Sequence, residues 1–335
     1  MLKLVEVFEG LAPPVSGSDA ENIFSVKQFG VANIWLGKSV RGKPAFLIQL
    51  PDLPSSTEPI SLDLVNLRAL HRCSVTLIED IEKRNVTASL IECLSEDDKL
   101  QSLFLETVGS SLSMDSSEVS GAQVQALITH LAELFRLVIS PGSGNILGLW
   151  AELLLINIAE DPAPLCHAWH PTTTGHADFA TNQERLEVKA TTTNYRRHHM
   201  SFEQANPPDS VFGAIASIMT EEIGDGVSLG ELWSGALRRV SGEPDLCNKI
   251  DRLCIRTLGT DWATARECSF DWPKAVETFR IFSVVSIPRI SRLSRGISSV
   301  RFESDMTDST PLDVSSPEVI AGGLVASVLS GLQKA

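Results

Sequence analysis

Residues 145–159, NILGLWAELLLINIA, are apolar almost all round, and Glu152 is their only charged residue. With Asn145 available to cap the first turn, the pattern predicts a helix that the rest of the protein covers on most sides. The segment is too short to span a bilayer. A buried lone carboxylate costs several kcal/mol unless it is paired, protonated or bound to a metal ion. Glu152 is therefore a candidate site residue, and the alternative is an acid at the helix rim that reaches water.

Two predicted strands downstream also carry charges among apolar residues. Asp178 lies in HADFAT, and Glu187 and Lys189 flank Val188 in RLEVKAT. Strand alternation places Glu187 and Lys189 on one face. If Asp178 faces the same side of an adjacent strand, the two carboxylates could share a Mg²⁺ ion, and the ammonium could orient or help deprotonate an attacking water. The set predicts metal-assisted phosphodiester hydrolysis, and the alternative is an acid-base network that braces the strands.

The order helix Glu152, strand Asp178, then Glu187-x-Lys189 resembles the PD-(D/E)XK nuclease superfamily. The similarity to one bacterial family within it covers most of the chain and includes GLWAEL, GHADF, LEVK and RRHHMSFEQ, with Ala177 where the motif has Pro. This resemblance implies an α/β (α+β) fold with a restriction-endonuclease-like core, a mixed central sheet flanked by helices. It also implies Asp178, Glu187 and Glu152 as metal ligands, Lys189 as the catalytic lysine, and Mg²⁺ (or Mn²⁺) as the cofactor.

A cationic run follows the predicted catalytic strand, beside Tyr195. Such residues can hold phosphates and the tyrosine can stack on a base, although a solvated loop would have the same composition. Alternation favours His199 as the one that points towards the site, and two polar residues further on are weaker candidates for phosphate or water contacts. The predicted substrate-binding residues are Arg196, Arg197, His198, His199, Ser201 and Gln204.

Cysteine and histidine residues crowd the stretch LCHAWHPTTTGHADF and raise the alternative of a zinc site. The four candidates are Cys166, His167, His170 and His176. Their spacing contains neither CxxC nor HxxxH, and they straddle a turn that contains proline. The spacing therefore argues against structural zinc. The six cysteines of the chain are expected to be reduced thiols of a cytoplasmic protein.

The chain is long enough for two domains. Two predicted hairpins, ANIWLGKSV with KPAFLIQL and CSVTLIED with NVTASLIECL, and a helix near residues 95–112 make residues 1–118 a smaller strand-rich domain. The serine-rich stretch SSLSMDSSEVSG is the predicted linker. Residues 119–335 then form the nuclease-like domain, which starts with the amphipathic helix AQVQALITHLAELFRLVI and continues with short strands that include LCHAWH.

The formal net charge of −14 argues against a protein whose whole surface coats nucleic acid. It predicts weak intrinsic affinity for DNA and delivery by a partner. The resemblance implies a DNA endonuclease of a bacterial restriction or anti-phage defence system, with ATPase, helicase or methyltransferase partners. The chain could also form a homodimer, and no membrane association is expected. The competing hypotheses are a non-catalytic scaffold or partner-recruiting subunit, and a nuclease for RNA or branched DNA.

Overall fold

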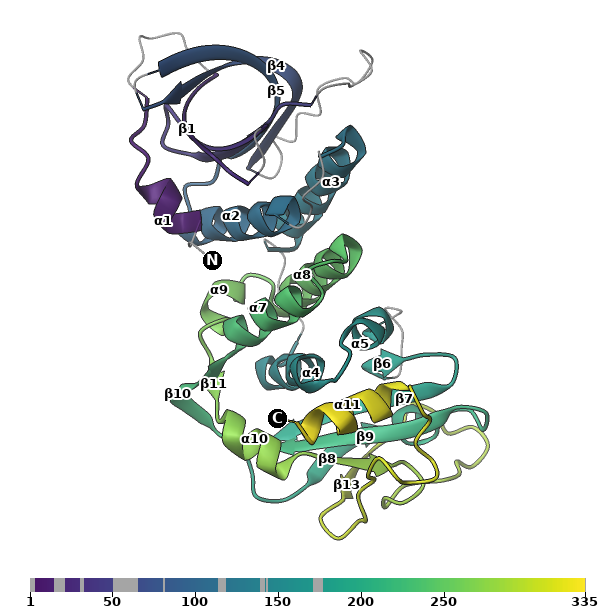
Figure 1. The fold of residues 1–335 in the computed structure, drawn as a ribbon. Coiled ribbons are helices and arrows are strands. Elements are labelled where there is room, and N and C mark those ends of the chain that lie inside the picture. The colour runs from purple at the N-terminus through teal and green to yellow at the C-terminus, as the bar shows by residue number, and fades with distance from the viewer. Residues whose placement is uncertain are drawn as a thin grey trace. The chain divides into compact units, whose positions relative to one another are not determined.

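The computed structural model describes residues 4–14, 22–30, 33–50, 66–80, 82–113, 119–138, 142, 144–170 and 177–334. The chain divides into two compact units, residues 1–140 and 141–335 (Figure 1). The predicted boundary after residue 118 differs from this division. Helix α3 (Gly121–Val138) packs against helix α2 (Asp98–Ser113) and strand β4 of the N-terminal unit, so it belongs there. The apolar face predicted for α3 is confirmed, because Val124, Ile128, Leu131, Phe135 and Val138 are all buried.

The N-terminal unit is a closed barrel with the strand order β1-β2-β3-β5-β4. Both predicted hairpins are confirmed as antiparallel pairs, β2–β3 and β4–β5, and the parallel pairing of β1 with β4 closes the barrel. An apolar cluster that includes Phe24, Trp35 and Leu90 is buried among these strands. Closure leaves no unpaired sheet edge. The elements are α1 (Leu4–Glu9), β1 (Ile23–Gln28), β2 (Ile34–Ser39), β3 (Pro44–Ile48), β4 (Leu67–Glu79) and β5 (Glu82–Cys93).

The C-terminal unit is built on a mixed four-stranded sheet of order β12-β9-β7-β6. Its central strands β7 (Glu184–Thr191) and β9 (Phe212–Met219) are parallel, and the outer strands β6 (Phe179–Ala180) and β12 (Arg280–Ser283) pair antiparallel. Six consecutive residues of β9 are buried, as is usual for a strand covered on both faces. Together with its helices this sheet gives the mixed α+β class that the resemblance implies.

Helices α4 (Ile146–Ile158) and α11 (Leu324–Leu332) pack against β7, and α10 (Trp272–Thr278) packs against β9. The ribbon of β8 (Arg197–Ser201) and β13 (Arg301–Asp305) lies across the sheet from α11 (Figure 1). Residue Met200 of β8 packs with Ile215 of β9, which holds the ribbon on the sheet. The remaining elements are α5 (Ala163–Ala168), α6 (Phe202–Ala205), β10 (Glu222–Ser228), α7 (Leu229–Arg239), α8 (Pro244–Leu258), α9 (Trp262–Ala265) and β11 (Ser269–Phe270).

Helix α4, which carries Glu152, is fixed at both ends. Asn145 accepts a hydrogen bond from the Leu147 amide at 3.0 Å, which confirms the predicted cap. At the other end the Arg239 guanidinium of α7 donates to carbonyls of residues 156, 157, 159 and 160, which α4 itself leaves unsatisfied. Among the described residues, no helix is both long and apolar enough to traverse a lipid bilayer.

The prediction of a strand at LCHAWH is wrong, because residues 163–168 form helix α5. Pro164 stands in the first turn, where its missing amide hydrogen leaves no intrahelical bond unmade. Leu165, Cys166 and Ala168 are buried, and the helix packs against α8. A short apolar run does not distinguish a buried strand from a buried helical turn, and here the tertiary contact decided.

Candidate metal and catalytic site

Asp178 immediately precedes β6, and its side chain reaches the neighbouring strand β7. Phe179 pairs with Leu186, so the same antiparallel register places Asp178 opposite Glu187. Directly opposite residues on antiparallel strands point to the same side of a sheet. The backbone amide of Val188 donates a hydrogen bond to Asp178 Oδ2 at 2.7 Å. The strand register therefore places on the same side of the sheet the two carboxylates that the sequence predicted to share an ion.

Glu187 is the most enclosed of the site residues. Its Oε1 lies 2.7 Å from Lys189 Nζ, two residues along β7, and accepts a further hydrogen bond from Gln204 Nε2 of α6. Gln204 is held by a capping box, in which it exchanges hydrogen bonds with Ser201 at the start of α6. Of the two polar residues predicted as weak substrate contacts, Gln204 therefore contacts Glu187 and Ser201 contacts Gln204. Its second oxygen, Oε2, is buried and has no hydrogen-bond partner within the described part of the chain.

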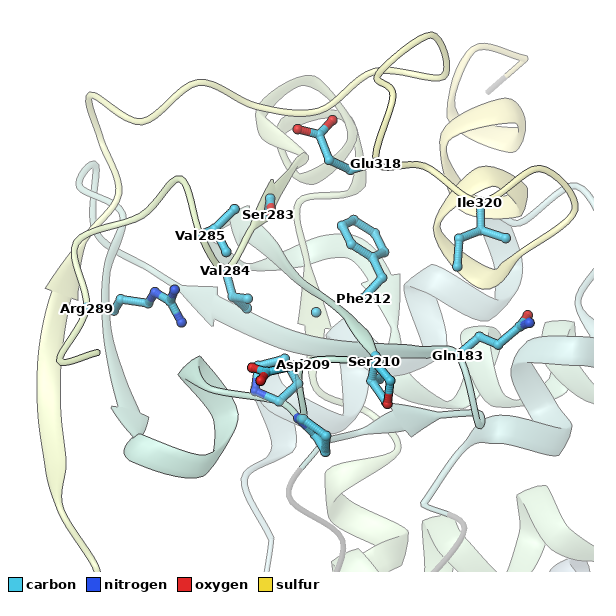
Figure 2. Close-up of a pocket in the computed structure, with 14 residues that line it drawn as sticks. Gln183, Asp209, Ser210, Phe212, Ser283, Val284, Val285, Arg289, Glu318 and Ile320 are labelled. Carbon is cyan, nitrogen blue, oxygen red and sulfur yellow. The ribbon is translucent and has the colours of Figure 1, made fainter. Parts of the chain in front are cut away.

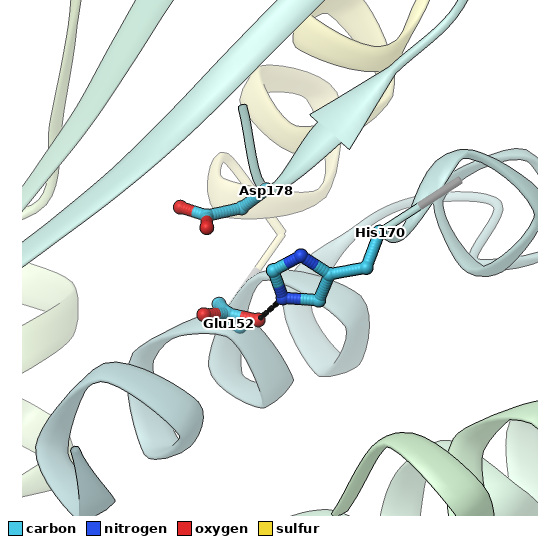
Figure 3. A group of neighbouring side chains, drawn as sticks. All are labelled: Glu152, His170 and Asp178. Carbon is cyan, nitrogen blue, oxygen red and sulfur yellow. Dashed lines mark hydrogen bonds and ion pairs between the residues drawn. The ribbon is translucent and has the colours of Figure 1, made fainter. Parts of the chain in front are cut away.

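Glu152 of α4 meets the Trp169–His170 segment that follows α5. Trp169 Nε1 donates to Glu152 Oε2 at 2.5 Å, and His170 Nε2 lies 2.9 Å from the same oxygen. The Trp169 ring stacks on Phe179 at the start of β6. Figure 3 shows the imidazole between the carboxylates of Glu152 and Asp178. One potential ligand atom from each of these three residues lies within 4.8 Å of the other two.

The sequence did not predict His170 as a partner of the acids. Its backbone has φ +40°, a left-handed conformation that is uncommon for a residue other than glycine, and its amide donates to the Asp178 carbonyl at 2.7 Å. This conformation turns the chain so that the ring meets Glu152. The only signal in the sequence was the crowding of Cys and His in this stretch, which gave no indication of the contact with α4.

The acids of the site act on one another electrostatically. Burial raises the pKa of Asp178, and the charges of Glu187 and Glu152 raise it further. Burial also raises the pKa of Glu187, while Lys189 lowers it and Glu152 raises it. Carboxylates that oppose one another's ionisation in this way are stabilised by a nearby cation. Lys189 supplies one positive charge against three acids.

The two arginines of the cationic run after β7 are held by protein groups and do not form the phosphate contacts that the sequence predicted. Arg196 is buried, and its guanidinium donates to the Ser217 carbonyl at 2.8 Å, to Ser217 Oγ at 2.9 Å and to the Thr278 carbonyl. Burial lowers the pKa of Arg196 to about 10. Arg197 is exposed but paired with Asp305 at 2.8 Å. The buried Arg196 side chain therefore links β9 to the end of α10 and is not available to a phosphate.

The two histidines of the run point in opposite directions, as alternation along β8 requires. His199, which the sequence favoured, is exposed and lies 3.9 Å from Glu303 on the partner strand. His198 is buried, 2.8 Å from Ser217 Oγ. Burial, with the charges of Lys189 and Arg196, lowers the pKa of His198 to about 4. The prediction that His199 points towards the site is therefore not met, because His199 lies on the exposed face of β8.

The alternative Cys and His metal site does not assemble among the described residues. Cys166 is buried, and burial raises the pKa of its thiol to about 12. His167 lies on the exposed side of α5, 3.5 Å from Glu243, whereas His170 turns to Glu152. His176 lies outside the described residues. These directions diverge, so the cluster is close only in sequence.

A hollow of about 580 Å³ lies at the start of β9 (Figure 2). None of the four predicted catalytic residues is among the described residues that line it. Arg289, at its edge, donates to the Ala205 carbonyl and to Asn206 Oδ1, both at 2.9 Å, so its charge is held by protein groups. The hollow is therefore separate from the acid cluster.

Comparison with known proteins agrees with the geometry. The model of the family described as "Putative PD-(D/E)XK family member, (DUF4420)" matches residues 6–307. No curated protein and no solved structure matches the chain. The matched range contains Glu152, Asp178, Glu187 and Lys189, and it confirms the resemblance drawn from their order. Because the match spans most of the sequence, the chain belongs to this PD-(D/E)XK-type family.

Proposed function

We propose that the C-terminal unit is a divalent-cation-dependent nuclease that hydrolyses phosphodiester bonds of DNA. The observation that carries this proposal is a group of three electrostatically linked acids from three elements, one of which is paired with an ammonium. Glu152 comes from α4, Asp178 from the start of β6, and Glu187 with Lys189 from β7. A brace between strands needs one ion pair, whereas the surplus of negative charge here is typical of a cation site.

The side chains fit a divalent ion. Glu152, His170 and Asp178 would hold it, since their ligand atoms lie within 4.8 Å of one another. Ligands about 2.1 Å from one ion lie at most about 4.2 Å apart, so the observed spacing is close to that of a shared site. The unpartnered Oε2 of Glu187 is a further acceptor, directly or through water. The ion would polarise the scissile phosphate and neutralise charge that develops on it.

The remaining groups act on water and phosphate. The Lys189 ammonium can orient the attacking water and stabilise negative charge on a phosphate oxygen. Glu187 holds that ammonium at 2.7 Å, and Gln204 holds Glu187 in turn. Such support keeps the lysine in place without a change of conformation during the reaction. Gln204 and Ser201 are therefore proposed as positioning residues.

The acidic character of the chain supports an arrangement in which a partner brings the nuclease to DNA. A nuclease that finds DNA unaided usually has a basic surface, and this chain has a net charge of −14. We therefore keep as proposals the role in bacterial defence and the ATPase, helicase or methyltransferase partners that the resemblance implies. A location in the cytoplasm is proposed because the six cysteines are free thiols.

The first test is cation binding together with cleavage. Mg²⁺ or Mn²⁺ is expected to raise the thermal unfolding midpoint of the metal-free chain by several degrees, because an ion that binds only the folded state stabilises it. Asp178→Asn keeps an oxygen for the Val188 amide but removes a charge, and should lose most of this shift. Asp209→Asn, which alters the hollow of Figure 2, is the matched control and should keep it. The wild-type chain should cleave DNA with the ion and not in EDTA.

A wild-type chain that shows neither the thermal shift nor cleavage of single-stranded DNA, duplex DNA or RNA would establish the scaffold alternative. Cleavage of RNA alone would keep the chemistry and change the substrate. Equal loss of the thermal shift in Asp178→Asn and Asp209→Asn would place the ion elsewhere. Thermal shifts are read without activity, so ion binding and catalysis are decided separately.

His170 is expected to set the preference among cations. Imidazole is a softer ligand than carboxylate and favours transition metals, so the wild-type chain should bind Mn²⁺ more tightly than Mg²⁺. His170→Ala should weaken Mn²⁺ binding by about tenfold and Mg²⁺ binding by less. The ratio of the Mg²⁺ to the Mn²⁺ dissociation constant should therefore decrease. Calorimetric titration measures both constants. The control is His167→Ala, which changes an exposed histidine three residues earlier and should leave both dissociation constants unchanged. If His170→Ala leaves the ratio of the two constants unchanged, the ring only supports Glu152.

A further inference from the structure

Positive charge gathers in a part of the sequence that the motifs did not indicate. From residue 278 to residue 302 the chain contains no Asp or Glu, although its net charge is −14. The same stretch contains the arginines at positions 280, 289, 292, 295 and 301. Residues 288–301, which comprise most of the connection between β12 and β13 and the first residue of β13, are called the arginine segment below. Its charge has the opposite sign to that of the chain as a whole.

Three of these arginines are uncompensated. Arg280 donates to carbonyls at the end of α10, and Arg289 is held by α6. Within the part of the chain that the structure describes, the exposed side chains of Arg292, Arg295 and Arg301 have no hydrogen bond or ion pair. The two acids of β13 have other partners, because Glu303 faces His199 and Asp305 pairs with Arg197 across the ribbon. Three positive charges therefore face solvent without a counterion from any residue that the structure describes.

The backbone of the arginine segment is anchored to the sheet and to α6. Ile287, just before the segment, and Met306, immediately after β13, are buried in the cluster that includes Met200 and Ile215. The Ser304 hydroxyl donates to the Pro288 carbonyl at 2.6 Å. On the α6 side, Asn206 Nδ2 donates to the carbonyl of residue 290 and the residue 202 amide donates to that of residue 300, both at 2.9 Å. Hydrogen bonds thus hold the backbone of the segment near both of its ends, at residues 288, 290 and 300.

A turn in the middle of the segment presents Arg295. The Ile297 amide donates to the Ser294 carbonyl at 3.2 Å, and Gly296 has φ +87°. A glycine with positive φ at the third position is characteristic of a type II turn, in which the second residue lies at the exposed corner. Arg295 occupies that corner. The exposed apolar side chains of Ile290 and Ile297 lie between the arginines in sequence.

The segment is linked to the acid cluster through one short helix. Helix α6, to which Arg289 and Asn206 tie it, also carries Gln204, whose amide contacts Glu187. Arg301 itself pairs across the ribbon with Ser201, the residue that caps α6. A chain of phosphates that passes the acid cluster can therefore continue along the arginine segment.

We propose that Arg292, Arg295 and Arg301 bind the phosphate backbone of the nucleic acid beside the cleaved bond, an inference that rests on the proposed function. Phosphate contacts by exposed arginines position a nucleic acid without reading its sequence. Ile290 and Ile297 would contact sugars or exposed bases. An anionic membrane is a poorer fit, because three arginines on a chain of net charge −14 are fewer than polybasic membrane segments carry.

The test compares two triple variants of the full chain. One is Arg292→Gln/Arg295→Gln/Arg301→Gln, and the control is Arg238→Gln/Arg252→Gln/Arg256→Gln, which removes the same charge from α7 and α8. Binding of fluorescent single-stranded and duplex DNA is measured by anisotropy in EDTA between 50 and 200 mM salt. The first triple should bind about tenfold more weakly. The negative slope of log K against log salt should become shallower by about 2 to 3, because each phosphate contact contributes about 0.7 to 0.9 to its magnitude. The control should resemble wild type.

Each outcome decides the proposal. Equal losses in both triples, or wild-type binding by the arginine-segment triple, would overturn it. So would a wild-type chain that binds phosphatidylserine vesicles and no oligonucleotide, or that binds neither. A selective loss of binding with no cleavage by any form would support the arginine segment while the nuclease proposal fails. A retained cation-induced thermal shift shows that the triple is folded.

Discussion

Lys189→Met is expected to lower the rate of phosphodiester cleavage by on the order of 100- to 1,000-fold, because it removes the one ammonium placed against the acids. The aliphatic stem is kept, so packing changes little. The variant should also be less stable, since Glu187 is left as a buried charge without its partner at 2.7 Å. Loss of activity alone would therefore not separate catalysis from a structural role.

The paired variant Glu187→Gln/Lys189→Met makes that separation. Both charges are removed together, so most of the stability lost in Lys189→Met should return. Activity should stay at the level of the single variants or below, because residues that act together in catalysis give non-additive losses. The measurements are urea unfolding and single-turnover cleavage. If the pair only braces β7, activity will return with stability in the paired variant, and the catalytic role proposed for Lys189 fails.

Acid is expected to destabilise the C-terminal unit through His198. The folded pKa is about 4, below the ordinary value of 6.5, because the ring is buried near Lys189 and Arg196. Above pH 6.5 the ring is neutral in both states. As the pH falls from 6.5 to 4 the unfolded chain gains a proton that the folded chain does not, so stability is lost in that window. The loss approaches about 3 kcal/mol when the pH falls below 4.

Hydrogen bonding explains why the folded protein favours the neutral form of the His198 ring. Ser217 Oγ accepts from Arg196, so its hydroxyl hydrogen is free to donate to His198 Nε2. Protonation would place a donor where the ring now accepts. His198→Gln should remove most of the acid-dependent loss in urea unfolding, and the exposed neighbour variant His199→Gln should keep it. The comparison of variants is essential, because Asp178 and Glu187 have raised pKa values and contribute stability that is lost as the pH rises. Identical acid dependence in both variants would contradict the assignment.

Elements with strong local patterns were predictable from the sequence. The apolar helix with its Asn145 cap, the alternation of RLEVKAT and the hairpins of the barrel all formed as expected. Local patterns failed where a strand and a helix would bury the same residues. LCHAWH formed a helix, and the central strand β9 was not anticipated because its apolar run has no alternation.

The site residues likewise divide into those that the sequence predicted and those that only the tertiary structure revealed. Glu152, Asp178, Glu187 and Lys189 were identified from charge in apolar surroundings, because an isolated charge in a core needs a specific reason. The sequence alone also determined the face shared by Glu187 and Lys189, since a two-residue step on a strand preserves direction. Only the tertiary structure brought His170 to Glu152, buried Arg196 and left the arginine segment uncompensated. Those outcomes depend on contacts between residues far apart in the chain, and no local pattern specifies which distant group will satisfy a charge.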